Sequence, residues 1–228
     1  MDWIKKFSTN KWPSWVSGNE EMSRFGSRFP ANYSRPFYML SMLLPGTPML
    51  YYGDEIGMSD FTGSTQPAMR GLMQWENTTN AGFQNCTSSC TTTPWTDVNS
   101  DYQTLNVKSQ GSTSGSLHGY IKELITLRAN DAFRYGEYKT ILSNDNIYSF
   151  VREFDGVTGY LVAINFGGSS ETHDYTSLHS TIKSTSSAVM TTGSGVGFSA
   201  EDEVDTTKLS LGPLQGIVVS WDYKAKEL

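Results

Sequence analysis

Short apolar runs alternate with polar loops over the first half of the chain. Residues 2–9 carry a helical pattern that ends ahead of a proline, and the apolar run at residues 15–17 leads directly into a charged loop at residues 18–24. A second helix is predicted over residues 36–44, and a buried strand over residues 49–52, which are too uniformly apolar to alternate. A polar loop follows that strand at once. This order of elements is typical of a (β/α) barrel, in which the chemistry lies on loops at the C-terminal ends of the strands.

A different pattern begins after a long polar stretch. Residues 59–116 are rich in Ser, Thr, Gly and Asn, which indicates an extended loop, and a helix with one apolar face is predicted over residues 116–127. From about residue 135 the apolar positions recur in short runs separated by turn signals, which predicts a small antiparallel β-sandwich. The predicted strands are residues 137–142, 146–153, 159–166, 181–190, 206–211 and 215–222, with residues 161–164 and 216–219 in the central ones.

Composition and charge narrow the class of function. The chain has 228 residues, enough for one large domain or two small ones, and a net charge of -6 with no basic cluster, which argues against nucleic acid as a partner. The spacing of its two cysteines, Cys86 and Cys90, is not a zinc pattern on its own, because a closed structural site needs four ligands and the three histidines lie elsewhere in the sequence. The pair could close a short disulfide in an oxidising compartment or remain as two thiols.

Secretion signals are weak. Asn32, Asn77 and Asn85 each begin an N-x-S/T triplet, but about as many arise by chance in a chain this rich in Ser and Thr. No signal peptide is visible, and the longest apolar run, residues 36–52, is broken by prolines and a glycine, so it cannot span a membrane. Because the chain opens inside a helical pattern without a cap, we expect that a preceding segment is missing.

Three ordered blocks resemble the α-glucosidase branch of the α-amylase superfamily, glycoside hydrolase family 13. The blocks are PGTPMLYYGDEIGM at residues 45–58, MRGLMQWE with NAGF at residues 69–83, and PWTDVNSDYQTLNV at residues 94–107. The resemblance implies an α/β fold: the C-terminal part of a (β/α)8 TIM barrel with a long active-face loop over residues 1–134, then a β-sandwich, domain C, over residues 135–228. It also implies that the N-terminal part of the barrel lies outside this chain.

The resemblance assigns roles to the loop at residues 18–24. Hydrolysis in this superfamily depends on a nucleophile, a general acid/base and a third carboxylate that stabilises the oxocarbenium-like transition state. The first two belong to strands that the chain lacks, and the third belongs to a G-N-H-D-x-x-R signature that aligns with GNEEMSR. Asn19 and Arg24 match substrate-binding positions, whereas Glu20 replaces the histidine, also a substrate-binding position, and Glu21 replaces the catalytic aspartate.

These two replacements weaken the implied catalytic site. A histidine can donate to a substrate hydroxyl, whereas the Glu20 carboxylate can only accept and adds negative charge. Glu21 keeps the charge but reaches one methylene further, and a displacement of about 1 Å in a catalytic group can lower the rate about 10²-fold. Adjacent carboxylates also repel each other. We therefore expect no efficient glycosidase activity.

The superfamily also has non-enzymatic members, the rBAT-type heavy chains of heteromeric amino-acid transporters. They keep the MQW…NAGF block with an eroded signature, and KWPSW at residues 11–15 resembles their K-W-P-x-W stretch. This resemblance implies an ectodomain on the extracellular face of the plasma membrane or in the secretory pathway, a membrane light chain as partner, and any anchor upstream. Two alternatives stay open: an α-glucosidase hydrolysing α-1,4-linked glucosides, and a pseudoenzyme that binds an α-glucoside. No metal or cofactor is implied.

Other polar and aromatic residues have weaker claims. Arg70 is a candidate to bind substrate, although a structural ion pair is an equal alternative. Asp54 and Glu55 end a predicted strand, but the resemblance assigns them to structure more than to chemistry. Trp75 and Trp95 could stack on a sugar ring or pack the long loop onto the barrel. The histidines have no matching partners in the sequence and are expected to be incidental: His118, His173 and His179.

Overall fold

The computed structural model describes residues 11–62, 67–84, 94, 96, 98–193 and 195–224. The predicted helix at residues 2–9, the possible disulfide Cys86–Cys90 and Trp95 lie outside the described residues. The contacts divide the chain into two compact units. The first contains Arg35–Thr47 and Leu124–Leu228, together with Met1–Pro13; the second contains Ser14–Ser34 and Pro48–Glu123. The predicted division at residue 134 stays a prediction.

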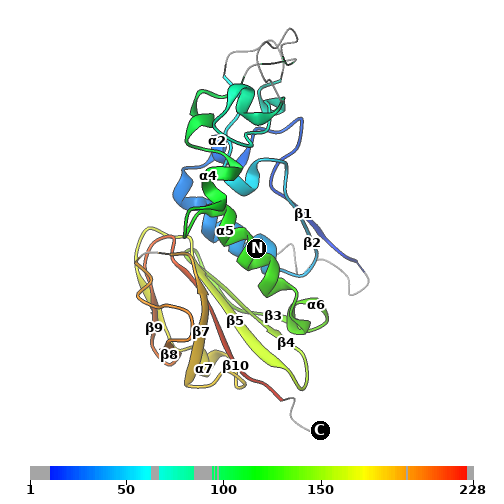
Figure 1. Cartoon of the computed structure of the whole chain (residues 1–228). Helices are drawn as coiled ribbons and strands as arrows, with labels where there is room; N and C mark the ends of the chain where they lie inside the picture. The colour runs from blue at the N-terminus through cyan, green and yellow to red at the C-terminus, as the bar shows by residue number, and fades with distance from the viewer. Residues whose placement is uncertain are drawn as a thin grey trace. The chain divides into compact units, whose positions relative to one another are not determined.

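A six-stranded antiparallel sheet dominates the first unit, in the order β3-β4-β5-β10-β7-β8 (Figure 1). Its strands are β3 (Glu137–Ser143), β4 (Ile147–Glu153), β5 (Thr158–Asn165), β10 (Gly216–Asp222), β7 (Thr185–Thr191) and β8 (Glu203–Asp205). A second sheet pairs β6 (Glu171–His173) with β9 (Leu209–Leu211). The two predicted central strands, β5 and β10, are indeed central, and their register runs from Gly216↔Ile164 to Asp222↔Thr158.

The core of the sandwich lies between these two sheets. Its buried side chains come from alternate positions of the large sheet, from β9 and from α7 (Tyr175–Leu178). They include Leu161, Ala163, Tyr175, Leu209, Leu211, Ile217 and Val219. The intervening residues of β4 and β5 are buried as well, so the opposite face of the large sheet is also covered along these strands.

Helices pack on the other face of the large sheet. They are α3 (Ser34–Leu43), α6 (Asp131–Arg134) and the C-terminal part of α5 (Leu117–Arg128), which confirms the helices predicted at residues 36–44 and 116–127. A Cβ built at Gly216 would lie 3.0 Å from Met39 Sδ, so this glycine lets α3 approach β10 closely. The rings of Phe133 and Tyr160 lie 4.9 Å apart.

Two arginines close the C-terminal end of α3. Arg128 donates to the carbonyl oxygens of Met42, Gly46 and, at 3.0 Å, Leu44. Arg152, which is buried, donates to the Leu43 carbonyl at 3.4 Å. Cations at this end of a helix satisfy its last carbonyl groups and oppose the helix dipole.

Two predicted strands of the sandwich were wrong in extent. The strand predicted over residues 206–211 begins only at Leu209, because Thr206 and Thr207 form a turn in which the Thr207 N–H donates to Asp205 Oδ1 at 3.0 Å. The strand predicted over residues 181–190 begins at Thr185, after a turn in which the Ile182 N–H donates to the His179 carbonyl at 3.1 Å. The short strands β6 and β8 were not predicted, since three residues are too few for an alternating pattern.

The second unit contains short elements joined by loops. The predicted strand at residues 15–17 is β1 (Ser14–Val16), which forms a two-stranded sheet with β2 (Thr47–Met49). The other elements are α2 (Phe25–Arg28), η1 (Ala31–Tyr33), η2 (Asp54–Ile56), η3 (Ala68–Arg70), η4 (Thr79–Gly82), η5 (Ser100–Gln103) and α4 (Val107–Gly111). Several of them lie within the stretch predicted to be one long loop.

The buried strand predicted over residues 49–52 is wrong in position and in burial. The strand ends at Met49, whose side chain is 52% exposed. Beyond it the chain turns: the Asp54 N–H donates to the Tyr51 carbonyl at 3.0 Å, and Gly53 adopts a left-handed φ of 85°. The uniformly apolar run predicted a strand with a neighbouring strand on each side. Among the described residues, β2 pairs with one strand, β1.

Candidate functional site

The loop at residues 18–24 begins two residues after β1 and turns back on itself. Asn19 Oδ1 accepts from the backbone N–H groups of Glu21 at 2.9 Å and Met22 at 2.8 Å. The Met22 N–H also reaches the Asn19 carbonyl oxygen at 3.4 Å. The Asn19 side chain therefore shapes the loop, as asparagine does in Asx turns.

Glu20 and Glu21 form the tip of this turn, and both are exposed. Their carboxylates form no ion pair or side-chain hydrogen bond with any other residue that the structure describes. Glu20 nevertheless acts on Tyr51: burial raises the pKa of the Tyr51 phenol to about 12, and the charges of Tyr52 and Glu20 add to that rise. The tip is thus a pair of solvated carboxylates beside an aromatic pair.

Arg24 anchors the end of the loop and is fully buried. Its guanidinium donates to the carbonyl oxygens of Tyr52 and, at 3.0 Å, Met69. The same group lies over the rings of Tyr51 and Tyr52, 4.7 and 4.4 Å from their centroids. Its backbone N–H donates to Asp60 Oδ1 at 2.8 Å. These contacts tie the end of the loop to Tyr52, Met69 and Asp60, and we call them the Arg24 clamp.

Asp54 holds the start of the loop through a hydrogen bond to Ser17, the residue that precedes it. Its side chain is 1% exposed, and its Oδ2 accepts from Ser17 Oγ at 2.5 Å and from the Tyr51 N–H at 3.0 Å. Its Oδ1 is buried without a hydrogen-bond partner among the described residues. Burial raises the pKa of this carboxyl, against the opposing effect of the Ser17 and Tyr51 hydrogen bonds. Arg28 donates to the Ser17 carbonyl, so both the side chain and the backbone carbonyl of Ser17 are hydrogen-bonded.

Sequence reasoning missed three residues that hold this loop: Ser17, Asp60 and Ser27. Ser23 Oγ donates to Asp60, and the Asp60 N–H donates to Ser27 Oγ at 2.6 Å. Between them, a Cβ at Gly26 would lie 2.9 Å from the Met58 carbonyl oxygen, so only glycine fits. The signal that could have found this contact is the serine and glycine content of residues 23–27, but it does not name the partners.

Arg70, the last predicted binding residue, ends η3 and is exposed. It follows Met69, whose carbonyl accepts from Arg24, so it is joined to the loop through the backbone. Within the described part of the chain its guanidinium makes no ion pair.

The recognised blocks are connected by buried polar contacts. Gln74 is fully buried and its amide donates to Asp101 Oδ1 at 3.0 Å and to the Leu105 carbonyl at 2.6 Å. Asn106 caps α4, accepting from the Ser109 N–H at 2.8 Å. Trp75 is 49% exposed. The block residues thus mainly fix the second unit's fold.

The segment NAGF contains an unusual run of backbone conformations. Asn80, Ala81 and Gly82 have φ values of 56°, 53° and 71°, in the left-handed region. The Ala81 carbonyl accepts from Trp75 at 2.9 Å and from Glu76 at 3.1 Å, and these bonds hold the run in place. A Cβ at Gly82 would lie 2.6 Å from Glu76 Cγ, which explains the glycine.

Two histidines expected to be incidental have carboxylate partners. His173 Nε2 lies 2.7 Å from Glu171, and His179 Nε2 lies 3.1 Å from Glu153. Both pairs belong to the sandwich. No group of three His, Cys, Asp or Glu side chains suited to a metal ion occurs in the described ranges.

The family description "Alpha amylase, catalytic domain" matches residues 1–136, and the chain therefore belongs to the α-amylase family. It is 33% identical over 98% of its length to the mouse amino acid transporter heavy chain SLC3A1 and 30% identical over 95% to the α-glucosidase of Culex pipiens, covering 33% and 37% of those proteins. The chain thus spans about a third of the length of these relatives.

Solved structures give the same fold. A Bacillus licheniformis trehalose-6-phosphate hydrolase superposes with a TM-score of 0.71 at 20% identity, over 92% of this chain and 43% of that one. A trehalulose synthase mutant superposes with a TM-score of 0.70 at 21% identity, over 93% and 44%. The chain is therefore a C-terminal barrel part followed by an antiparallel β-sandwich. None of the helices in the described residues is long and apolar enough to cross a bilayer.

Proposed function

We propose that the protein is a heavy-chain-type member of the α-amylase family that supports a membrane-embedded amino-acid transporter subunit and has lost efficient hydrolysis. The observation that carries the proposal is the loop at residues 18–24. Its supports are intact, since Arg24 is clamped and Asn19 closes the turn, yet its tip carries Glu20 and Glu21. A retained scaffold with an altered tip fits a fold kept for assembly.

The altered tip disfavours hydrolysis for two reasons. The catalytic carboxylate would sit one methylene further from the backbone, and misplacement of about 1 Å costs about 10²-fold in rate. The neighbouring exposed carboxylate of Glu20 adds negative charge where a donor is expected. The structure gives neither carboxylate a partner among the described residues that would redirect it.

Similarity to the mouse heavy chain over nearly the whole chain supports the transporter-associated alternative. On this proposal the protein is an ectodomain at the extracellular face of the plasma membrane or in the secretory pathway. Its partner is a transporter light chain, and any anchor belongs to a part of the protein outside this chain.

A second candidate function is α-glucoside hydrolysis, supported by the similarity to the Culex α-glucosidase and by the retained Asn19 and Arg24. A third, binding of an α-glucoside without turnover, would use the same loop. Both predict that residues at the loop tip affect sugar binding, whereas the heavy-chain proposal does not.

Co-expression tests the proposal. The full-length protein would be expressed with each amino-acid transporter light chain of its own organism, and co-purification and amino-acid uptake would be measured. We expect a stable complex with at least one light chain and higher uptake than from the light chain alone. The matched variant Glu20→His/Glu21→Asp, which restores the hydrolase signature, should support the same uptake. Failure of every light chain to co-purify would refute the proposal.

A further inference from the structure

The buried carboxyl of Asp54 joins two distant segments of the second unit. Asp54 begins η2 and is 1% exposed. Its Oδ2 accepts from the Ser17 hydroxyl at 2.5 Å and from the Tyr51 N–H at 3.0 Å. Ser17 lies 37 positions earlier in the chain and is the last residue before the loop at residues 18–24. The carboxyl therefore connects the start of this loop to η2.

The ionised form of this carboxyl is only partly compensated. Asp54 Oδ1 is buried and has no hydrogen-bond partner among the described residues. Burial raises the pKa of the Asp54 carboxyl, and the hydrogen bonds from Ser17 and Tyr51 oppose that rise only in part. The charged groups that act on it are the guanidinium groups of Arg24 and Arg28, which also favour the carboxylate. Leaving a buried polar atom unpaired costs most when that atom carries charge, so the neutral acid suits this position better.

Ser17 can satisfy either protonation state of Asp54. Its Oγ lies 2.5 Å from Asp54 Oδ2 and 3.3 Å from the Met49 carbonyl oxygen. When Asp54 is ionised, the Ser17 hydroxyl donates to Oδ2. When Oδ2 carries the proton, Asp54 donates to Ser17 Oγ and the Ser17 hydroxyl turns to the Met49 carbonyl, because a hydroxyl both donates and accepts. The neutral pair thus keeps its donors bonded and removes the charge from Oδ1.

We propose that Asp54 and Ser17 form a proton-controlled latch that holds the loop at residues 18–24 closed. In the opened loop, Ser17 is separated from Asp54 and water reaches the carboxyl. The closed loop therefore binds the Asp54 proton more tightly than the opened loop does, and protonation favours closure. This stabilisation is complete below the ordinary aspartate pKa and is lost as pH rises through the raised one. The latch concerns the order of the loop, so it does not depend on the function proposed above.

Hydrogen exchange of the Glu21 and Met22 amides in the full-length protein measures loop opening across a pH series. The rates are corrected for the intrinsic pH dependence of exchange. We expect the opening equilibrium to grow with pH, about tenfold for a closed-to-opened pKa difference of one, since that difference is a tenfold change in the equilibrium. Carboxyl NMR of Asp54 gives the closed-state pKa independently, and the two measurements should agree.

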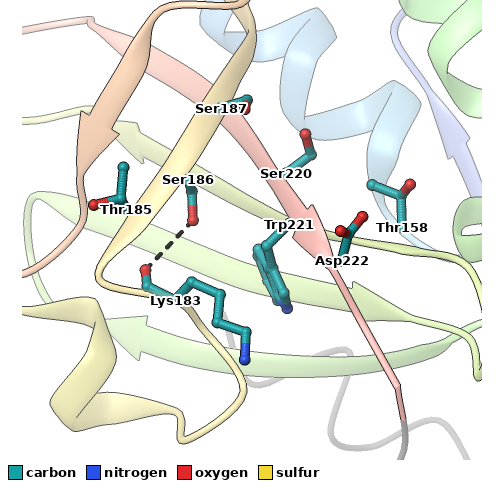
Figure 2. Close-up of a pocket in the computed structure, with 8 residues that line it drawn as sticks. All are labelled: Thr158, Lys183, Thr185, Ser186, Ser187, Ser220, Trp221 and Asp222. Carbon is teal, nitrogen blue, oxygen red and sulfur yellow. Dashed lines mark hydrogen bonds between the residues drawn. The ribbon is translucent and has the colours of Figure 1, made fainter.

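Two aspartate variants separate the latch from a general effect of pH. Asp54→Asn keeps a neutral side chain of similar size, so loop exchange should stay at its low-pH level throughout the series. Asp222→Asn is the matched control. Asp222 is an exposed aspartate of β10 that lines a groove in the sandwich, far along the chain from the loop (Figure 2). Its variant should show the native pH dependence.

Ser17→Ala tests the connection itself. Removing the hydroxyl should weaken the pH dependence of loop exchange, while the Asp54 carboxyl still titrates by NMR. A structural role of Asp54 alone would alter exchange equally at every pH. The proposal is overturned if exchange of the native loop does not change with pH, or if Asp54→Asn or Ser17→Ala retains the native pH dependence in full.

Discussion

Replacing Arg24 by methionine should loosen the loop at residues 18–24 far more than the same replacement at Arg70. Both arginines were candidates for substrate binding, but Arg24 is fully buried and Arg70 is exposed. Methionine keeps much of the side-chain volume and removes the charged donor. Comparing Arg24→Met with Arg70→Met therefore measures how much the contacts of Arg24 stabilise the loop.

The magnitude follows from the contacts of Arg24. Two hydrogen bonds from a charged donor contribute about 1.5–3 kcal/mol each. The contacts over Tyr51 and Tyr52 contribute about 0.5–2 kcal/mol more. Removing the guanidinium also removes the cost of burying its charge, so we expect a net loss of about 3 kcal/mol. Arg70→Met should change local stability by no more than about 0.5 kcal/mol.

Backbone hydrogen exchange of the full-length protein measures this loss where it occurs. A loss of about 3 kcal/mol raises the exchange of the Glu21 and Met22 amides about 100-fold, since every 1.4 kcal/mol is tenfold. Arg24→Lys should resemble Arg24→Met, because an ammonium cannot reproduce the forked donor stacked on two rings. Equal exchange in the Arg24 and Arg70 variants would refute the clamp.

Three other outcomes follow from single contacts. Gly26→Ala should destabilise the protein by about 1–3 kcal/mol, because the added Cβ meets a backbone carbonyl oxygen. Gly168→Ala is the control: the space around Gly168 is open, so its free energy of unfolding in urea should change by no more than about 0.5 kcal/mol. The pKa of Glu171 is lowered to about 2, and the hydrogen bond from Asn146 contributes most to this shift. Carboxyl NMR should show this pKa in the native protein and a higher one in Asn146→Ala. An unchanged pKa in the variant would contradict the assignment. Burial raises the pKa of the Asp54 carboxyl, so the folded state binds this proton more tightly than the unfolded state. The free energy of unfolding should therefore fall as pH rises from the ordinary aspartate pKa through the raised one. Urea unfolding at a series of pH values measures this fall, and the same pH dependence in Asp54→Asn would contradict the assignment.

Strong periodicity predicted the larger elements well. The helices α3 and α5 and the strands β3, β4, β5 and β10 all lie within a few residues of their expected positions. Each has a long apolar face, so local pattern and tertiary burial agree. The three-residue strands and the turn before Leu209 were missed, because pairing partners rather than pattern define elements that short.

The site was predicted only in part for a related reason. The sequence located the loop at residues 18–24, because its neighbours in the chain carry the family blocks. It could not supply the supports of the loop: Ser17 and Asp54 are 37 residues apart, and Arg24 and Met69 are 45 apart. Such contacts depend on how the chain folds back, and no local spacing encodes them. They also give Arg24 an anchoring role, while the substrate-binding role that the resemblance implies stays a prediction.

The histidines show the same limit. His173 and His179 looked incidental because their partners are not recognisable by motif, yet each lies against a glutamate. Glu171 and His173 are two residues apart in β6, so their side chains lie on the same face of that strand. Because the sequence did not predict β6, it did not predict this contact.

Hydrolysis of a chromogenic α-glucoside by the full-length protein tests the central claim most directly. The account predicts no turnover above the uncatalysed background, because it assigns Glu20 and Glu21 to the positions of the histidine and the catalytic aspartate in the family signature. Clear turnover by the native protein, abolished in Glu21→Gln, would contradict it.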